Sequence, residues 1–180
     1  MSNWNKVIKP IVVLCVICVV ITGALAATNS VTAPIIAEAT RLAQEQARAE
    51  LLPEADSFEK VENVAVENVS DVYAATNGAG YVITSTAKGY GGTMTVMVAY
   101  TPDGTIKQIK VTEQGETQGI GSKVAGTASY WERYQGQPAA ELKINKDGGT
   151  IDAESGATIS SRALAKAVSS ANEAYNAVNS

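Results

Sequence analysis

Residues 10–27 form the longest hydrophobic stretch of the chain, PIVVLCVICVVITGALAA, which contains no charged residue. At a rise of about 1.5 Å per residue, a helix of this length reaches about 27 Å, close to the hydrocarbon thickness of a bilayer. The pattern therefore predicts a membrane-spanning helix. A cleaved signal peptide is the alternative, because Lys6 and Lys9 precede the stretch and ALA at 24–26 resembles a cleavage site. The apolar core of a signal peptide is usually only about 7 to 15 residues long, which favours a retained anchor.

Beyond this span, apolar residues recur at helical spacing from Pro34 to Leu51, and the spacing predicts a second helix over residues 34–51. Pro34 is suited to the first turn of a helix, where its missing N–H donor is not needed. We expect this helix to lead from the membrane into the domain that follows.

Between Ser57 and Val111 the hydrophobic period changes to two, which is typical of strands with one buried face. The runs VENVAV, DVYAA and YVITSTA, separated by turn-forming residues, predict antiparallel strands. The clearest hairpin joins TMTVMVAY to TIKQIKV through TPDG, in which Pro102 and Gly104 suit the turn.

Glycine-rich loops follow, and helical spacing then returns and predicts a last helix from about Ile159 to Val178. Helix, sheet, loops and helix in separate segments indicate the α+β class. The predicted organisation is a cytoplasmic N-terminus and transmembrane helix at residues 1–28, a connecting helix at 29–56 and a single domain at 57–180.

The charges of the chain are unevenly distributed. After residue 27 the chain has 18 acidic and 12 basic residues, a formal net charge of −6. An acidic domain is unsuited to binding nucleic acid, so we expect no such partner. Lys6 and Lys9 precede the span with no acidic residue beside them. The positive-inside rule therefore predicts a cytoplasmic N-terminus and a domain outside the cell membrane.

Metal and catalytic chemistry have little basis in the sequence. Cys15 and Cys18 lie inside the predicted span, and the chain has no histidine. Without a second pair of cysteines, they are most simply two small apolar residues of a helix, so we expect no metal site. The predicted outer domain shows no arrangement of nucleophile and base. Four aromatic residues are conspicuous, and they are expected in the hydrophobic core, with contact to the ring of a bound ligand as the alternative; they are Tyr90, Tyr130, Trp131 and Tyr134.

Small side chains are concentrated at residues 155–158, SGAT, at the predicted start of the last helix. The first N–H groups of a helix lack intrahelical acceptors, and the helix dipole is positive there, which favours an anion such as phosphate. Gly156 and Ala157 leave this backbone uncovered, and Thr158 adds a hydroxyl. Because Ser and Thr are preferred helix caps, a cap without any ligand is the alternative.

Residues 152–158, DAESGAT, resemble the flavinylation motif of a known FMN-binding domain. The G subunit of Rnf complexes and the C subunit of the sodium-pumping quinone reductase share this domain. In that family, a flavin transferase esterifies the last threonine of the motif to the phosphate of FMN. The resemblance implies that Thr158 carries a covalent FMN.

Other segments resemble the same family over nearly the whole chain. ITGALAATNSVTAPIIAEA resembles its exit from the membrane, LLPEA the end of its first outer helix, and GYGGTMTVMVAY the entry into its central hairpin. ETQGIG at 116–121 is similar to the family's flavin loop, ETPGLG, with Gln118 in place of Pro and Ile120 in place of Leu. The length of the chain is close to that of compact Rnf G subunits, which favours the G subunit over the longer C subunit.

The resemblance also implies roles for residues around Thr158. Arg162, one helical turn later, is expected to help neutralise the phosphate, and a solvated surface role is the alternative. Glu116 and Thr117 are expected either to hydrogen-bond the isoalloxazine ring or to close a turn. The other predicted cofactor-binding residues are Ser155, Gly156, Ala157, Gly119 and Gly121.

The function implied by the resemblance is that of an electron-transfer subunit. It would belong to a membrane-bound ferredoxin:NAD oxidoreductase complex that translocates Na⁺ or H⁺, with no complete active site on this chain alone. The implied partners are the other subunits, the membrane and a flavin transferase. Two alternatives keep the flavin, namely a stand-alone anchored flavoprotein for extracellular electron transfer and the C subunit of a sodium-pumping quinone reductase. The third alternative has no flavin: a membrane-tethered binding domain in which SGAT is only a helix cap.

Overall fold

The computed structural model describes residues 8–179, and the chain divides into two compact units, residues 1–43 and residues 44–180. Helix α1 (Lys9–Leu51) begins in the first unit and ends in the second, at the residue predicted. Its N-terminal part is long and apolar enough to cross a membrane, and none of that part is buried in the protein. Lys6, which contributes to the predicted orientation, lies outside the described residues.

The prediction of a separate helix at residues 34–51 is wrong, because α1 continues through Pro34 without interruption. Just before this proline, the hydroxyls of Thr28, Ser30 and Thr32 each donate to a carbonyl three or four residues earlier, at 2.9, 2.8 and 3.1 Å. Because the helix itself satisfies these polar side chains, the segment TNSVT does not end it.

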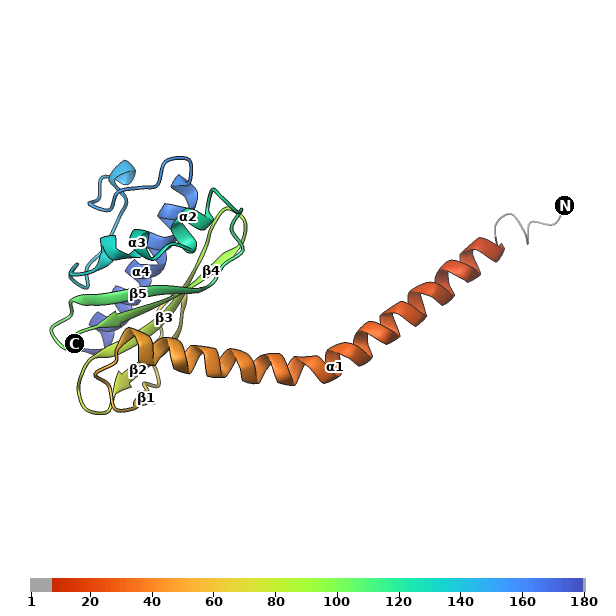
Figure 1. The fold of residues 1–180 in the computed structure, drawn as a ribbon, viewed down its shortest axis with the longest axis horizontal. Helices are drawn as coiled ribbons and strands as arrows, with labels where there is room; N and C mark the ends of the chain where they lie inside the picture. Colours follow the sequence, from red (N-terminus) through yellow and green to blue (C-terminus); the bar gives the residue numbers. More distant parts are fainter. Residues whose placement is uncertain (1–7, 180) are drawn as a thin grey trace. The chain divides into compact units, whose positions relative to one another are not determined.

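Five strands form one antiparallel sheet in which each strand pairs with the next along the chain (Figure 1). The sheet and its flanking helices confirm the α+β class, and the predicted hairpin is formed by the last two strands. Its turn contains Gly104 at φ +84°, a left-handed conformation that glycine adopts readily. The strands are β1 (Phe58–Lys60), β2 (Val69–Ala75), β3 (Tyr81–Lys88), β4 (Thr93–Tyr100) and β5 (Ile106–Glu113).

The predicted strand VENVAV, residues 61–66, is wrong, because this segment between β1 and β2 has no regular structure. Asn63 and Asn68 both adopt a φ of 65°, which lies outside the range of an extended strand. The three valines of the segment nevertheless pack against the main hydrophobic core. The apolar pattern of this segment therefore reflects burial and not strand geometry.

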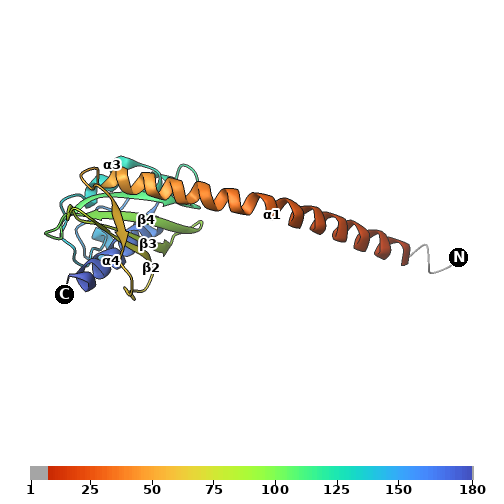
Figure 2. The same cartoon turned by 90° about the horizontal axis from the view of Figure 1, so that it is seen from below.

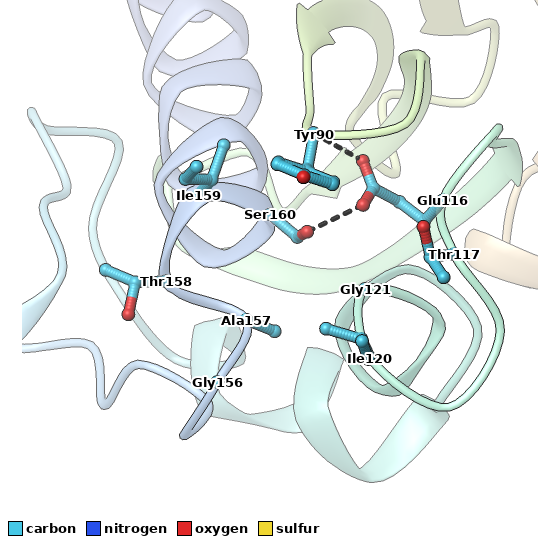
Figure 3. Close-up of a pocket in the computed structure, with 10 residues that line it drawn as sticks. All are labelled: Tyr90, Glu116, Thr117, Ile120, Gly121, Gly156, Ala157, Thr158, Ile159 and Ser160. Carbon is cyan, nitrogen blue, oxygen red and sulfur yellow. Dashed lines mark hydrogen bonds between the residues drawn. The ribbon is translucent and has the colours of Figure 1, made fainter.

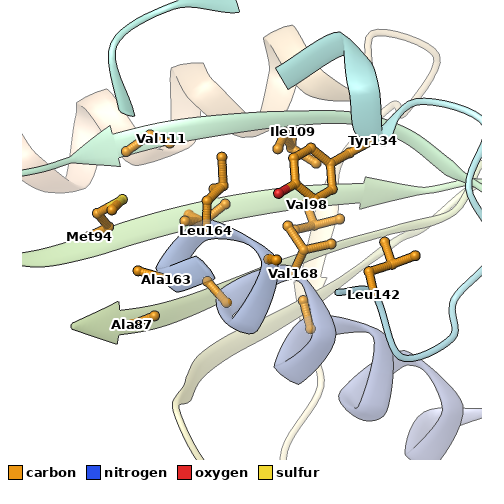
Figure 4. Close-up of a cluster of buried hydrophobic side chains, with 14 of the residues drawn as sticks. Ala87, Met94, Val98, Ile109, Val111, Tyr134, Leu142, Ala163, Leu164 and Val168 are labelled. Carbon is orange, nitrogen blue, oxygen red and sulfur yellow. The ribbon is translucent and has the colours of Figure 1, made fainter. Parts of the chain in front are cut away.

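The sheet has an apolar cluster on each face, because successive residues of a strand point to opposite sides. On one side, Ile83 and Val98 belong to the main core beneath helix α4 (Thr158–Val178) (Figure 4). On the other side, Val82 and Met97 pack with Leu51, in the part of α1 that belongs to the second unit. The sheet thus lies between α4 and the last turns of α1 (Figure 2).

The chain between β5 and α4 contains only short helical elements. Within this segment, Tyr130 and Tyr134 are buried in the main core as predicted, and the half-buried Trp131 donates its indole N–H to the Val124 carbonyl at 2.9 Å. The predicted last helix is confirmed, with a start one residue earlier than expected. The short elements are α2 (Ser122–Ala125), α3 (Ala128–Trp131), η2 (Glu132–Tyr134) and η3 (Asn145–Asp147).

Candidate functional site

A cavity of about 430 Å³ lies beside the start of α4 (Figure 3). Its walls come from three segments that are distant in the sequence: the turn between β3 and β4, the loop after β5, and the first residues of α4. The volume lies within the range of small-molecule pockets. The lining residues are Tyr90, Glu116, Thr117, Ile120, Gly121, Gly156, Ala157, Thr158, Ile159 and Ser160.

Glu116 joins these walls. Only 7% of this residue is exposed, and its carboxylate accepts the backbone N–H of Tyr90 at Oε1 (2.9 Å) and the Ser160 hydroxyl at Oε2 (2.7 Å) (Figure 3). A buried carboxylate requires such donors, because it has lost its hydration. Glu116 therefore ties the β3–β4 turn to α4, and protein groups occupy both of its oxygens.

Two glycines make room for this carboxylate. A Cβ atom at Gly89 would lie 1.9 Å from Glu116 Oε1, and one at Gly121 would lie 2.1 Å from Oε2. Next to the carboxylate, the Thr117 carbonyl accepts the N–H groups of Ile120 and Ser122 at 3.2 and 3.3 Å. Glu116 therefore has a structural role in this loop through its carboxylate, and Thr117 has one through its backbone carbonyl. A hydrogen bond from either residue to the isoalloxazine ring stays a prediction.

The chain enters α4 without a side-chain cap. Thr158 is the first helical residue, and Ala157, at the N-cap position, makes no capping hydrogen bond through its side chain. The interpretation of SGAT as a cap formed by Ser155 or Thr158 is therefore wrong. Gly156, at φ +82°, turns the chain into the helix in a conformation that glycine adopts readily.

The first turn of α4 consequently keeps free hydrogen-bond donors. Within residues 8–179, the N–H groups of Thr158, Ile159 and Ser160 have no acceptor. They lie at the positive end of the helix dipole, beside the cavity. The Thr158 hydroxyl accepts a hydrogen bond from Lys146 Nζ at 2.8 Å, which adds a cation to the same place.

Arg162 is exposed, as in the second of its two predicted roles, and forms an ion pair with Asp147. Its guanidinium donates from Nε and Nη2 to the two carboxylate oxygens of Asp147, at 2.6 and 2.7 Å. These bonds hold the pKa of Asp147 below its ordinary value. Arg162 does not line the cavity, and the structure brings Lys146, not Arg162, to Thr158.

Comparison with known proteins identifies the family. Residues 89–173 match the FMN-binding domain, and residues 1–51 match the RnfG N-terminal region. The G subunit of the proton-translocating ferredoxin:NAD(+) oxidoreductase complex of Clostridium ljungdahlii is 34% identical over 155 residues, which cover 83% of this chain and 80% of that one. The G subunit of the Na(+)-translocating complex of Acetobacterium woodii is 32% identical over 195 residues, covering 96% and 93%. The chain belongs to the Rnf G-subunit family.

The fold of this chain is also similar to that of a solved structure. It is the C subunit of the Na(+)-translocating NADH-quinone reductase of Parabacteroides distasonis, with a TM-score of 0.49, 20% identity and coverage of 60% of each chain. The matched FMN-binding domain includes every residue that lines the cavity.

The cavity brings together most, but not all, of the predicted cofactor-binding residues. Ser155 and Gly119 do not line the cavity, and the Gly119 N–H donates to Ser122 Oγ at 2.8 Å. Those that line it are Glu116, Thr117, Gly121, Gly156, Ala157 and Thr158.

Two residues of the site, Tyr90 and Lys146, are not among the predicted cofactor-binding residues. The prediction that Tyr90 is a core residue is wrong, because it is 72% exposed and lines the cavity. Its neighbours in GYGG were a usable signal, since a glycine-rich turn seldom provides a buried position. No signal in the sequence pointed to Lys146, which lies 12 positions before Thr158.

Proposed function

We propose that this chain carries electrons within an ion-translocating ferredoxin:NAD oxidoreductase complex, on an FMN joined through its phosphate to Thr158 Oγ. The bond formed is a phosphodiester, and the net change is the addition of FMN with loss of one water. The observation that carries the proposal is the position of Thr158, the last residue of the DAESGAT motif. It is the first helical residue of α4, at the edge of the cavity and beside donors that have no acceptor.

The residues present at the cavity fit FMN. The free N–H groups at the start of α4 suit the phosphate, and Gly156 has no side chain to cover them. Tyr90, Ile120 and Ile159 are 72%, 52% and 49% exposed and provide apolar surface for a flat ring. Glu116 acts as a positioning residue, because it holds the surrounding segments together.

The division of labour between protein and cofactor follows from this arrangement. A bound FMN supplies reversible electron transfer, and the chain supplies binding, position and electrostatics. A covalent bond keeps the flavin on a domain outside the cell membrane, where a dissociated flavin would be lost by dilution. We propose this location, with the N-terminus in the cytoplasm, from the lysines that precede the span.

The test of the attachment is the intact mass of the full chain isolated from cells that express a flavin transferase. We expect the wild-type chain to gain about 438 Da, the mass of FMN less one water, and to remain yellow after denaturation. Thr158→Ala is expected to gain no mass, whereas the matched control Thr127→Ala, a change in an exposed threonine that does not line the cavity, retains the gain. A colourless wild-type chain at its polypeptide mass would refute the covalent site.

Membership of the complex has its own test. A tagged chain purified from native membranes is expected to bring other subunits of the oxidoreductase with it. A chain that arrives alone, while still carrying about 438 Da, would favour the stand-alone flavoprotein and would leave the attachment at Thr158 intact.

A further inference from the structure

A cationic side chain from another part of the chain hydrogen-bonds Thr158. Lys146 lies in the short helix η3, and its Nζ donates to Thr158 Oγ1 at 2.8 Å. The atom that accepts this bond is the one to which the proposed function assigns the phosphate. A lysine ammonium can rotate three donors toward nearby oxygens, so the same group can reach phosphate oxygens attached to Oγ1.

Lys146 is available for an anion. Within residues 8–179, no carboxylate forms an ion pair with it. Its neighbour in sequence, Asp147, is already paired with Arg162 through two hydrogen bonds of 2.6 and 2.7 Å. The positive charge of Lys146 therefore remains uncompensated beside Thr158.

The turn that presents Lys146 is held on both sides. Before it, the Asn145 side chain donates to Asp152 Oδ1 at 3.0 Å and accepts the N–H of Ala153 at 3.3 Å, which fixes the turn to the segment leading into α4. After it, Asp147 is bound to Arg162 on α4 itself. These contacts set where the lysine stem begins and reduce the conformational entropy lost when the ammonium binds.

We propose that Lys146 is the phosphate-binding cation of the flavin site, and that Asp147 and Arg162 are positioning residues for it. This inference rests on the proposed attachment at Thr158. A phosphodiester carries one negative charge, which the ammonium and the first N–H groups of α4 share. Arg162 contributes through Asp147 and the η3 turn, without touching the phosphate.

The first measurement is the rate of attachment. The full chain is co-expressed with the flavin transferase, and intact mass is followed over time for the wild type, Lys146→Met, Lys146→Arg and Lys166→Met. Lys166 is the matched control, an exposed lysine of α4 with no ion pair in the part of the chain that the structure describes. We expect Lys146→Met to slow the mass gain roughly 10- to 100-fold, as for loss of a charge-assisted hydrogen bond. Lys146→Arg should stay within about threefold of the wild type, and Lys166→Met should equal it.

The second measurement separates phosphate binding from recognition by the transferase. Each variant is allowed to react until chain carrying the covalent flavin accumulates, and the ³¹P NMR spectrum of this product is recorded in detergent. Loss of the ammonium in Lys146→Met is expected to shift the phosphodiester resonance, whereas Lys166→Met leaves it unchanged. Slower attachment with an unchanged resonance would overturn the proposal, since Lys146 would then act only on the encounter with the enzyme.

The two proposals fail in distinguishable ways. Equal attachment rates for the wild type and Lys146→Met would overturn the role of Lys146 and leave the covalent site standing. A wild-type chain that gains no mass would overturn both. Misfolding could also slow attachment, so the thermal unfolding of each variant without flavin is compared with that of the wild type. We expect the unfolding temperatures to match, because Lys146 is exposed.

Discussion

The two ends of helix α4 are built from different kinds of contact. Near its C-terminal end, Tyr175 stacks on Tyr100 with a centroid distance of 4.9 Å and meets Tyr81 edge to face at 5.6 Å. The Tyr100 hydroxyl also donates to Asn172 Oδ1 at 2.6 Å. Aromatic area and a satisfied buried hydrogen bond both stabilise this end.

The N-terminal end has small side chains, free backbone donors and charged neighbours. Ala157 is buried but small, and a buried hydrogen bond joins Ser160 to Glu116 at this end. The comparison teaches that one helix separates two tasks. Its packed end holds α4 on the sheet, so its other end can leave polar groups available for a ligand. The two ends should therefore respond differently to substitution.

The largest effect on stability is expected at Gly121, which packs against the Glu116 carboxylate near the N-terminal end of α4. In Gly121→Ala, the new Cβ would lie 2.1 Å from Glu116 Oε2 and 2.8 Å from Ser160 Oγ, so the wall of the cavity must shift. We expect a loss of about 3 kcal/mol in the free energy of unfolding, as in an overpacked core. Chemical denaturation measures this loss, and intact mass should show slower flavin attachment.

Gly115→Ala is the matched control for that substitution. Its new Cβ would find no atom closer than 3.4 Å, an ordinary van der Waals distance, although Gly115 is adjacent to Glu116. We expect a change below about 1 kcal/mol. Equal losses for the two variants would show that crowding at Glu116 is not the cause.

A smaller effect is expected from two tyrosine hydroxyls of the main core. Tyr100→Phe leaves Asn172 Oδ1 without its buried donor and should cost about 2 kcal/mol. The Tyr134 hydroxyl is buried with no partner among residues 8–179, and burial raises its pKa well above the ordinary value, so it stays neutral. Tyr134→Phe should therefore be neutral or slightly stabilising. Denaturant titration of both variants measures the difference, and a costly Tyr134→Phe would contradict this account.

The sequence predicted the parts of the fold that depend on local chemistry. The β4–β5 hairpin follows from Pro102 and Gly104 in its turn, and the last helix follows from apolar residues at helical spacing. The predicted strand at residues 61–66 was wrong, because closely spaced valines also occur in an irregular segment packed on the core. The division of α1 was wrong because hydroxyls that usually favour turns bond inside the helix.

The site was predictable only where a motif marked it. DAESGAT and ETQGIG indicated two of the three walls of the cavity, and covalent attachment at Thr158 stays a prediction. The exposure of Tyr90 and the approach of Lys146 to Thr158 depend on how loops far apart in the sequence meet. Arg162 is nearer to Thr158 in sequence, but its guanidinium is paired with the Asp147 carboxylate of η3.

The smallest expected effect concerns the ion pair behind Lys146. Arg162 lowers the pKa of Asp147, so the contribution of this pair to stability is present above the unfolded-state pKa and is lost as pH falls through the folded-state pKa. In Arg162→Gln, carboxyl ¹³C NMR should show the pKa of Asp147 rising toward its ordinary value. Asp103 is the internal control, because hydroxyls of Thr101 and Thr105 lower its pKa and are unchanged. Flavin attachment should slow by only about threefold, since the Asn145 contacts still hold the turn. A loss as large as in Lys146→Met would mean that Arg162 itself contacts the phosphate.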